Sequence, residues 1–235
     1  MRTTSVTRGI IAAVLLSVAM PFTAKAQESV EASVGADIVS NYLWRGIDCG
    51  GVSIQPSVTL GYKGLSLSAW GNVGLESTDT KEVDFTLGYT TGGLSLAVTD
   101  YYFFQSGDAV KYFEYDCHST AHVFEATVGY DFGVLALSWN TNFAGSDYYK
   151  ADGGRSYSTY VGMSAPFKLG GLAWAAEVGF TPWEGMYSDG FNLTNITLSV
   201  AKEVPITNTF SLPLSGQVTF NPDANRAYFA VGISF

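Results

Sequence analysis

Charged side chains alternate with apolar ones in several segments, and these are the residues whose types and spacing could do chemistry. Asp37, Asp84, Glu125 and Glu177 each lie between apolar neighbours. In an extended strand a period of two places such a charge on the face opposite the apolar side chains. Arg45 follows the same alternation and supplies a positive charge. Carboxylates opposite an arginine form either a charged constriction that filters solutes or salt bridges that close a plug.

The two histidines are the other candidates for chemistry. His118 and His122 are four residues apart, and Asp116 lies beside them. The spacing lacks the glutamate of a zinc-protease motif, and the residues fall where a loop meets a strand, so the ring nitrogens would not share a helix face. We interpret them as water-bound histidines at a rim. We expect no metal site, no cofactor and no catalytic residue.

A repeated hairpin provides the scaffold for these side chains. A strand, a tight turn containing glycine and a second strand recur at 58–67, 85–96 and 126–137, with looser copies around 168–171 and 203–209. The connections between successive hairpins are longer and more polar: 46–52, 77–81, 104–120, 144–156 and 182–190. Short turns on one side and long loops on the other are typical of a transmembrane barrel, with the short turns in the periplasm.

The alternation predicts about twelve strands, or ten if two pairs are loop structure. The expected segments are 30–45, 52–62, 65–75, 82–90, 94–103, 121–131, 134–143, 156–167, 172–181, 191–202, 210–220 and 226–235. Their mean length is near the ~9–11 residues that a tilted crossing requires. We therefore expect an all-β, up-and-down antiparallel transmembrane β-barrel. A secreted β-sandwich also alternates, but it needs neither aromatic girdles nor a terminal phenylalanine.

Because successive side chains of a strand point to opposite faces, the alternation shows which residues face lipid and which face the lumen. Tyr62, Tyr89 and Tyr130 fall at the periplasmic strand ends, and Tyr42 and Trp44 fit the outer aromatic girdle. The lumen then receives the polar set: Asp37, Asn41, Arg45, Asp84, Glu125, Asn140, Asn142, Glu177, Asn195, Thr197 and Gln217. Only 14% of the residues are charged, against about a quarter in a soluble domain. A face against lipid accounts for that shortage.

The beginning of the chain has the pattern of an export signal. Arg2 and Arg8 precede an apolar run that is too short to span a bilayer as a helix, and Ala24-Lys25-Ala26 is a small-x-small cleavage site. We expect residues 1–26 to be removed, which leaves one barrel domain at 27–235. An uncleaved anchor is the alternative. Cleavage would change the formal net charge from −9 to −12, which argues against a nucleic-acid partner.

The chain ends in a strand with one apolar face. Phe229, Val231, Ile233 and Phe235 alternate with small or polar residues. A terminal aromatic strand in an exported chain indicates the outer membrane of a Gram-negative bacterium, with outer-membrane lipid around the barrel. This strand also resembles the C-terminal signal read by the barrel-assembly machinery, although Ala230 stands where that signal has glycine. We expect that machinery to be a partner during biogenesis.

The cysteines predict a cross-link. Cys49 and Cys117 lie in the first and third long connections. The export route is oxidising, and an even number of cysteines there favours a disulfide. Two unpaired loop thiols are the alternative.

The segment Val39-Ser40-Asn41-Tyr42-Leu43-Trp44-Arg45-Gly46-Ile47 resembles the N-terminal signature of the TorF-like porin family of exported bacterial proteins. Gln55-Pro56 and the segment Leu67-Ser68-Ala69-Trp70-Gly71-Asn72 also match that family's pattern. The likeness covers about the first quarter of the mature chain closely. It implies an outer-membrane barrel of channel type.

These observations favour a narrow passive channel or porin for small cations or polar solutes, because the acidic excess disfavours anions. A structural or adhesion-type barrel is the main alternative. A lipid hydrolase is a further one, since His122 and Asp100 fall on the outward face of neighbouring strands. No outward serine accompanies them at the same height, so we expect no enzyme.

Overall fold

The computed structural model describes residues 29–104, 111–116, 119–208 and 210–235. The strands in these residues are β1 (Glu31–Val39), β2 (Tyr42–Trp44), β3 (Ile47–Gly50), β4 (Ser53–Tyr62), β5 (Leu65–Gly74), β6 (Lys81–Thr91), β7 (Leu94–Phe104), β8 (His122–Asp131), β9 (Ala136–Gly145), β10 (Thr159–Leu169), β11 (Leu172–Thr181), β12 (Asn192–Pro205), β13 (Ser211–Asn221) and β14 (Arg226–Ser234). The expected signal at 1–26 lies outside the described residues.

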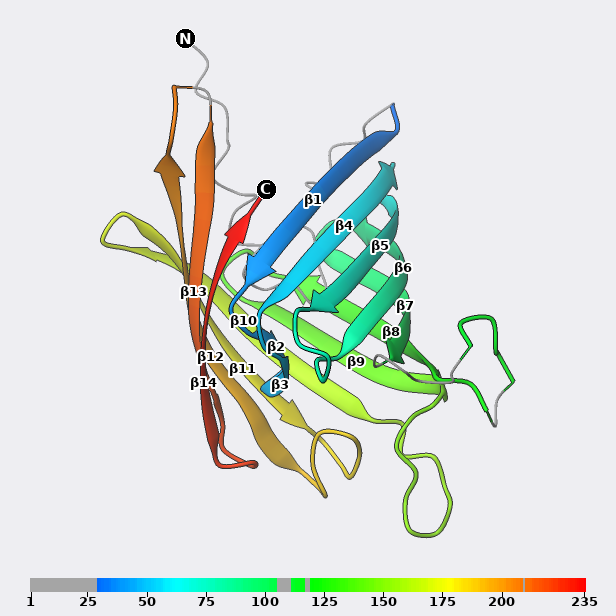
Figure 1. Ribbon diagram of the computed structural model, residues 1–235. Coiled ribbons are helices and arrows are strands. Elements are labelled where there is room, and N and C mark those ends of the chain that lie inside the picture. Colours follow the sequence, from blue (N-terminus) through cyan, green and yellow to red (C-terminus); the bar gives the residue numbers. More distant parts are fainter. Residues whose placement is uncertain (1–28, 105–110, 117–118, 209) are drawn as a thin grey trace.

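A closed antiparallel barrel contains all of these strands except β2 and β3 (Figure 1). Each strand pairs with its neighbours in sequence order, with β4 next to β1, and β1 also pairs with β14. Twelve strands of the described chain therefore form the wall, so the predicted up-and-down barrel is confirmed and the ten-strand alternative is wrong. The described part of the chain contains no helix long and apolar enough to cross a membrane.

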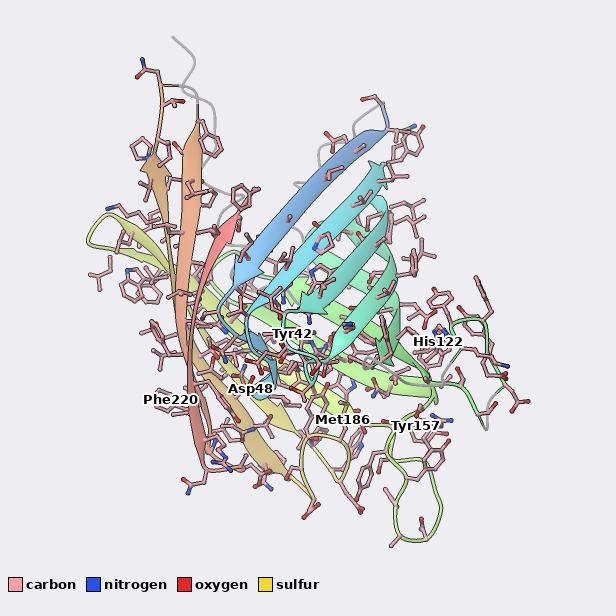
Figure 2. All side chains as sticks on the ribbon, in the orientation of Figure 1. Tyr42, Asp48, His122, Tyr157, Met186 and Phe220 are labelled. Carbon is pink, nitrogen blue, oxygen red and sulfur yellow. The ribbon has the colours of Figure 1, made fainter. Side chains whose placement is uncertain are left out.

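Apolar side chains cover the outside of the wall. Leu87, Val128 and Phe229 point outward and are 59%, 52% and 63% exposed. Phe220 also lies on the outside, whereas Tyr42 lies within the barrel (Figure 2). Exposed tyrosines stand at the short-turn ends of the strands, as predicted for Tyr62, Tyr89 and Tyr130. An apolar outer face with aromatic residues at its edge suits a bilayer.

The interior of the wall is polar. Its buried side chains are mostly hydroxyls and amides that bond across neighbouring strands. Examples are the hydroxyl pairs Thr59–Ser68 at 2.9 Å and Thr86–Thr99 at 3.0 Å. Buried polar groups need such partners, because an unpaired one costs free energy. The apolar core is confined to one level of the lumen, where rings from the wall pack around β2 and β3.

The prediction of a first strand at 30–45 is wrong beyond Val39, where β1 ends. The chain bends at Ser40 and Asn41, and Tyr42–Gly50 folds back into the lumen as a hairpin of β2 and β3 instead of continuing up the wall. Figure 1 shows this hairpin between the two sides of the barrel. Tyr42 and Trp44 are only 7% and 6% exposed, so they are not members of an outer girdle. We call residues 42–50 the lumen hairpin.

The seam between the first and last strands is short. β1 and β14 share three Cα partners, from Asp37 with Ser234 to Val39 with Gly232. Backbone hydrogen bonds between Ala36 and Phe235 extend the seam at one end, and a hydrogen bond from the Ser40 amide to the Val231 carbonyl extends it at the other. On its other edge β1 pairs with β4 along its whole length. The last strand therefore closes the barrel over only part of β1.

Candidate functional site

The lumen hairpin turns tightly at Arg45 and Gly46. Their φ angles are 49° and 83°, and a two-residue loop with both φ values positive is the type I′ turn that favours right-twisted hairpins. A Cβ on Gly46 would fall 2.0 Å from the carbonyl oxygen of Thr194. Thr194 lies at a register irregularity between β11 and β12. The turn therefore docks on the far wall so closely that only glycine fits.

An ion pair fixes the tip of the hairpin. The Arg45 guanidinium donates to both carboxylate oxygens of Glu125 on β8, at 2.5 and 2.9 Å, and to the hydroxyl of Tyr187 at 2.7 Å. Tyr101 adds a hydrogen bond to Glu125 at 3.1 Å. Both charged side chains are almost fully buried. Removing one partner of such a pair would leave a buried, uncompensated charge.

Aromatic rings surround this ion pair. The guanidinium carbon of Arg45 lies 4.6 Å from the ring centre of Trp44 and 5.0 Å from that of Tyr160. The Trp44 ring packs in turn against Tyr101 and Tyr187. A cation over ring faces in a dry site is attracted to them by about 2 kcal/mol. The hairpin tip is thus held by charge, hydrogen bonds and ring contacts together.

Further hydrogen bonds attach the hairpin to opposite sides of the barrel. On one side the Tyr42 hydroxyl donates to Glu82 of β6 at 2.8 Å. On the other side the Asn221 amide of β13 donates to the Gly46 carbonyl at 3.1 Å. Since β6 and β13 are far apart around the barrel, the hairpin crosses the lumen and leaves space on either side of itself.

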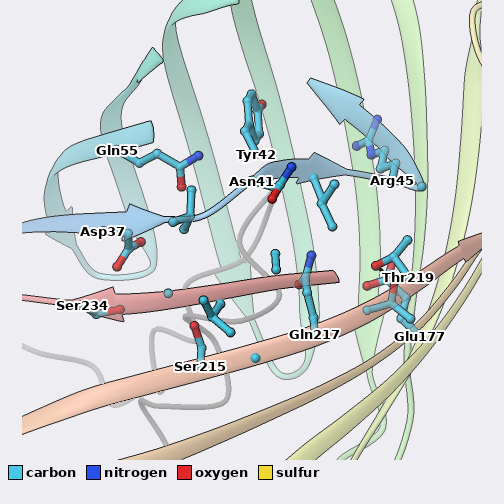
Figure 3. Close-up of a pocket in the computed structure, with 18 of the residues that line it drawn as sticks. Asp37, Asn41, Tyr42, Arg45, Gln55, Glu177, Ser215, Gln217, Thr219 and Ser234 are labelled. Carbon is cyan, nitrogen blue, oxygen red and sulfur yellow. Dashed lines mark hydrogen bonds between the residues drawn. The ribbon is translucent and has the colours of Figure 1, made fainter. Parts of the chain in front are cut away.

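A polar cavity of about 110 Å³ lies between the hairpin and the wall formed by β11–β14 and β1. Figure 3 shows Asp37, Glu177 and Gln217 in its lining, with Arg45 at one end. Glu177 accepts hydrogen bonds from the Tyr160 hydroxyl at 2.7 Å and from the Asn195 amide at 2.9 Å. The predicted lumen carboxylates Asp37 and Glu177 therefore both line this cavity, without contact between them.

An aromatic cavity of about 150 Å³ lies on the opposite side of the hairpin, against β4–β8. Tyr42, Trp44, Trp70 and Tyr101 supply its rings, and serine and threonine hydroxyls line much of the remainder. The predicted lumen residue Asp84 belongs here. The structure therefore places Asp84 apart from Asp37 and Glu177. Arg45 lines the polar cavity and is paired with Glu125.

Sequence reasoning did not identify several members of this site. Glu82 shares the lumen face of β6 with Asp84, two residues away, so the period of two could have found it. Tyr187 comes from the loop between β11 and β12, where no periodicity operates. Trp44 alternates as a lipid-facing residue would, so its periodicity alone did not distinguish burial in the lumen from contact with lipid.

His122 lies on the outside of the barrel wall (Figure 2), where neighbouring side chains cover it completely. His122 Nδ1 is 2.7 Å from Oδ1 of Asp100, and Nε2 is 2.6 Å from the carbonyl oxygen of Tyr112. Tyr115 stacks on the ring at 4.3 Å. His122 is therefore covered by residues 111–116 and is not a water-bound rim histidine, which corrects that interpretation. His118 lies outside the described residues.

Cys49 lies on β3, inside the barrel and next to the ring cluster. Burial, together with the charges of Glu82 and Asp48, raises the pKa of the Cys49 thiol well above its ordinary value. Cys117 lies outside the described residues, so the disulfide stays a prediction. Three or more histidine, cysteine or acidic side chains do not gather as a metal site anywhere in the described residues.

The closed wall, the apolar outer face and the polar lumen together define a protein of the outer-membrane β-barrel class. No protein-family model matches the chain, and no curated protein matches it significantly. The likeness to TorF-like porins thus stays a hypothesis.

Several solved barrels are similar in outline. The NanC porin is 9% identical with a TM-score of 0.47, over 86% of this chain and 98% of that one. An outer membrane channel from Pseudomonas putida F1 is 16% identical with a TM-score of 0.41, over 91% and 97%. Outer membrane phospholipase A from Escherichia coli is 14% identical with a TM-score of 0.41, over 97% of each chain. Likenesses this low support no statement about activity.

Proposed function

We propose that this protein is a narrow passive channel of the outer membrane for small cations and neutral polar solutes. The observation that carries the proposal is the lumen hairpin, which crosses a polar barrel and leaves cavities lined by carboxylates on both sides. Acidic side chains in a confined space with low-dielectric walls concentrate cations and repel anions. The ion pair of Arg45 with Glu125 neutralises one carboxylate, so the selectivity falls to Asp37, Asp84 and Glu177.

Removal of the lumen hairpin tests the proposal directly. Val39 of β1 and Ser53 of β4 are register partners, so Asn-Gly can replace residues 40–52 and join the two strands by a tight turn. We expect a several-fold higher conductance in a planar bilayer. The matched control replaces residues 150–154 by Asn-Gly, because Tyr149 and Arg155 also form an isolated bridge and that loop tip is largely exposed. The control should conduct like the wild type.

Reversal potentials across a salt gradient test the selectivity. Wild-type protein should favour the cation, and the double variant Asp37→Asn, Glu177→Gln should reduce this preference. Asp223→Asn, in the exposed turn between β13 and β14, should not change it. A folded barrel that passes no current, with or without the lumen hairpin, would leave the structural or adhesion-type role as the better account.

A lipid hydrolase is the remaining candidate, because His122 and Asp100 are in contact on the outer face. Nε2 of His122 lies against the Tyr112 carbonyl, so this nitrogen is not free to take a proton from a nucleophile. Among the described residues, the hydrogen bonds of the ring include no serine hydroxyl. Both facts favour a role for His122 in holding the loop, so we propose no enzymatic activity.

A further inference from the structure

Asp84 in the aromatic cavity has an acceptor atom that the protein does not use. The residue is 8% exposed, and among the described residues nothing donates a hydrogen bond to its Oδ1. A buried acceptor without a partner costs free energy, and a charged one costs more. Native structures leave few such atoms, and each one calls for an explanation. A ligand that donates to this carboxylate would supply one.

The neighbours of Asp84 indicate the shape of such a ligand. Asp84 is the register partner of Trp70 on β5 and of Tyr101 on β7. All three side chains line the cavity, so the carboxylate stands in a row between two aromatic residues. Tyr42 and Trp44 of the lumen hairpin contribute further rings. A small body with an apolar surface would pack against these rings, as aromatic faces in a pocket require.

The charges around the cavity indicate the sign of the ligand. Glu82 lies two residues from Asp84 on the same strand face, shares a side-chain hydrogen bond with it, and accepts a hydrogen bond from the Tyr42 hydroxyl. Arg45, the cation of the lumen hairpin, is held by both carboxylate oxygens of Glu125. Among the described residues, no lysine or arginine forms a salt bridge with Asp84. The two neighbouring carboxyl groups therefore favour a positively charged ligand over a neutral one and disfavour an anion.

Carboxylate and ring faces in one pocket are the means by which proteins bind organic ammonium ions. The ring faces attract the cation and the carboxylate accepts its N–H groups. The volume of about 150 Å³ is on the order of a cavity that holds a benzene-sized molecule. Thr90, whose hydroxyl also lacks a partner among the described residues, offers a second polar contact at the short-turn end.

We propose that the aromatic cavity binds a small organic primary ammonium ion, with the ammonium group at Asp84 and the apolar body against Trp70 and Tyr101. This inference rests on the proposed function, because it names the class of solute that the channel would select. The lumen hairpin, through Tyr42 and Trp44, would then form part of the binding site as well as the obstruction.

Calorimetric titration of the folded mature chain in detergent tests the proposal without any need for transport. The probes are benzylammonium chloride and its neutral counterpart, benzyl alcohol. The ammonium ion should bind at least tenfold more tightly. Asp84→Asn should lower the affinity for the ammonium ion at least tenfold and leave the alcohol unchanged, and Trp70→Leu should weaken both. The exposed control Asp223→Asn should bind like the wild type.

The proposal is overturned if both probes bind equally, if neither binds, or if Asp84→Asn binds the ammonium ion as the wild type does. If Asp84→Asn does not fold, as judged by heat-modifiable mobility on gels, Trp70→Leu and the comparison of the two probes still decide. Failure of the channel is separate: ammonium binding without any conductance would keep the site and refute transport. Conductance without ammonium binding would support transport and refute the ammonium site.

Discussion

At the scale of single residues, Gly46 provides a sharp test of the docked turn. Gly46→Ala should displace the turn, because its Cβ would meet the Thr194 carbonyl, and Arg45 would lose its alignment with Glu125. Gly133 is the matched control: its φ of +86° is similar, but nothing lies within 4 Å of the added Cβ. An alanine in the left-handed region costs about 1–2 kcal/mol in either place.

We therefore expect Gly133→Ala to lose only that amount of unfolding free energy in urea titration and to keep wild-type conductance. Gly46→Ala should lose more and conduct more. Equal behaviour of the two variants in both measurements would contradict the docking of the turn.

Cys49 gives a second prediction at this scale. A thiol with a raised pKa is mostly protonated near pH 8, and the thiolate is the reactive form. If Cys49 is free, iodoacetamide should label it slowly in the folded barrel, with a rate that rises as the pH increases, and quickly after unfolding. If Cys49 is bonded to Cys117, unfolded protein should remain unlabelled until a reductant is added. Rapid labelling of the folded protein at pH 8 would contradict the shielded, half-buried position of Cys49.

The sequence predicts single residues well where they belong to a regular strand. Asp84 and Glu125 alternate with apolar neighbours, and the structure places both in the lumen. Their partners are a different matter. Glu125 bonds to Arg45, 80 residues away in the sequence, and the barrel closure that brings them together leaves no local trace in either segment.

At the scale of elements, the lumen hairpin shows why part of the fold escaped prediction. Tyr42 and Trp44 continue the alternation of β1, and an inward hairpin packed against rings has the same period as a lipid-facing strand. Because the chain changes direction at Ser40 and Asn41, the side chains that would have faced lipid are buried in the lumen. The Arg45-Gly46 pair was the available signal, because a short turn ending in glycine between two strands is a hairpin signature.

The segment 111–116 gives a prediction for an element outside the lumen. The His122 ring meets an acceptor at each nitrogen and stacks with Tyr115, and these contacts hold the segment on the wall. His122→Ala should expose Lys111 to trypsin about tenfold faster, as expected from roughly 1.4 kcal/mol less protection against local opening. Cleavage at Lys150, in another loop, is the internal control and should not change. Unchanged cleavage at Lys111 would show that His122 does not hold the segment.

At the scale of the whole molecule, the short seam makes the C-terminus important. Phe235 is 62% exposed and exchanges backbone hydrogen bonds with Ala36. Phe235→Asp should reduce the amount of assembled, heat-modifiable barrel, because the closing strand loses its apolar end and gains an acid near the interface, at up to about 1 kcal/mol. Phe132→Asp, at an exposed aromatic in the turn between β8 and β9, should assemble nearly normally. Equal assembly of both variants would mean that the last residue has no special role.

The overall architecture was predictable because every strand repeats the same constraint. One face meets lipid and the other meets water, so alternation, turn glycines and loop lengths all indicate a closed barrel. The interior was not predictable to the same extent. Which carboxylate pairs with Arg45, and which keeps an oxygen without a hydrogen bond, as Asp84 does, depends on where a single inserted segment lies.

The position of the lumen hairpin next to the seam has a consequence for the order of assembly. The hairpin directly follows β1, which is one of the two strands that close the barrel. Its partner Asn221 is 175 residues away in the sequence, and such distant contacts form late and slowly in folding. The contact with Asn221 needs β13 and β14 to reach β1, so it is completed together with the closure of the ring. A chain stalled before that step would be an open sheet with its aromatic cluster uncovered, and the last contacts to form would be the ones that both seal the wall and fill the pore.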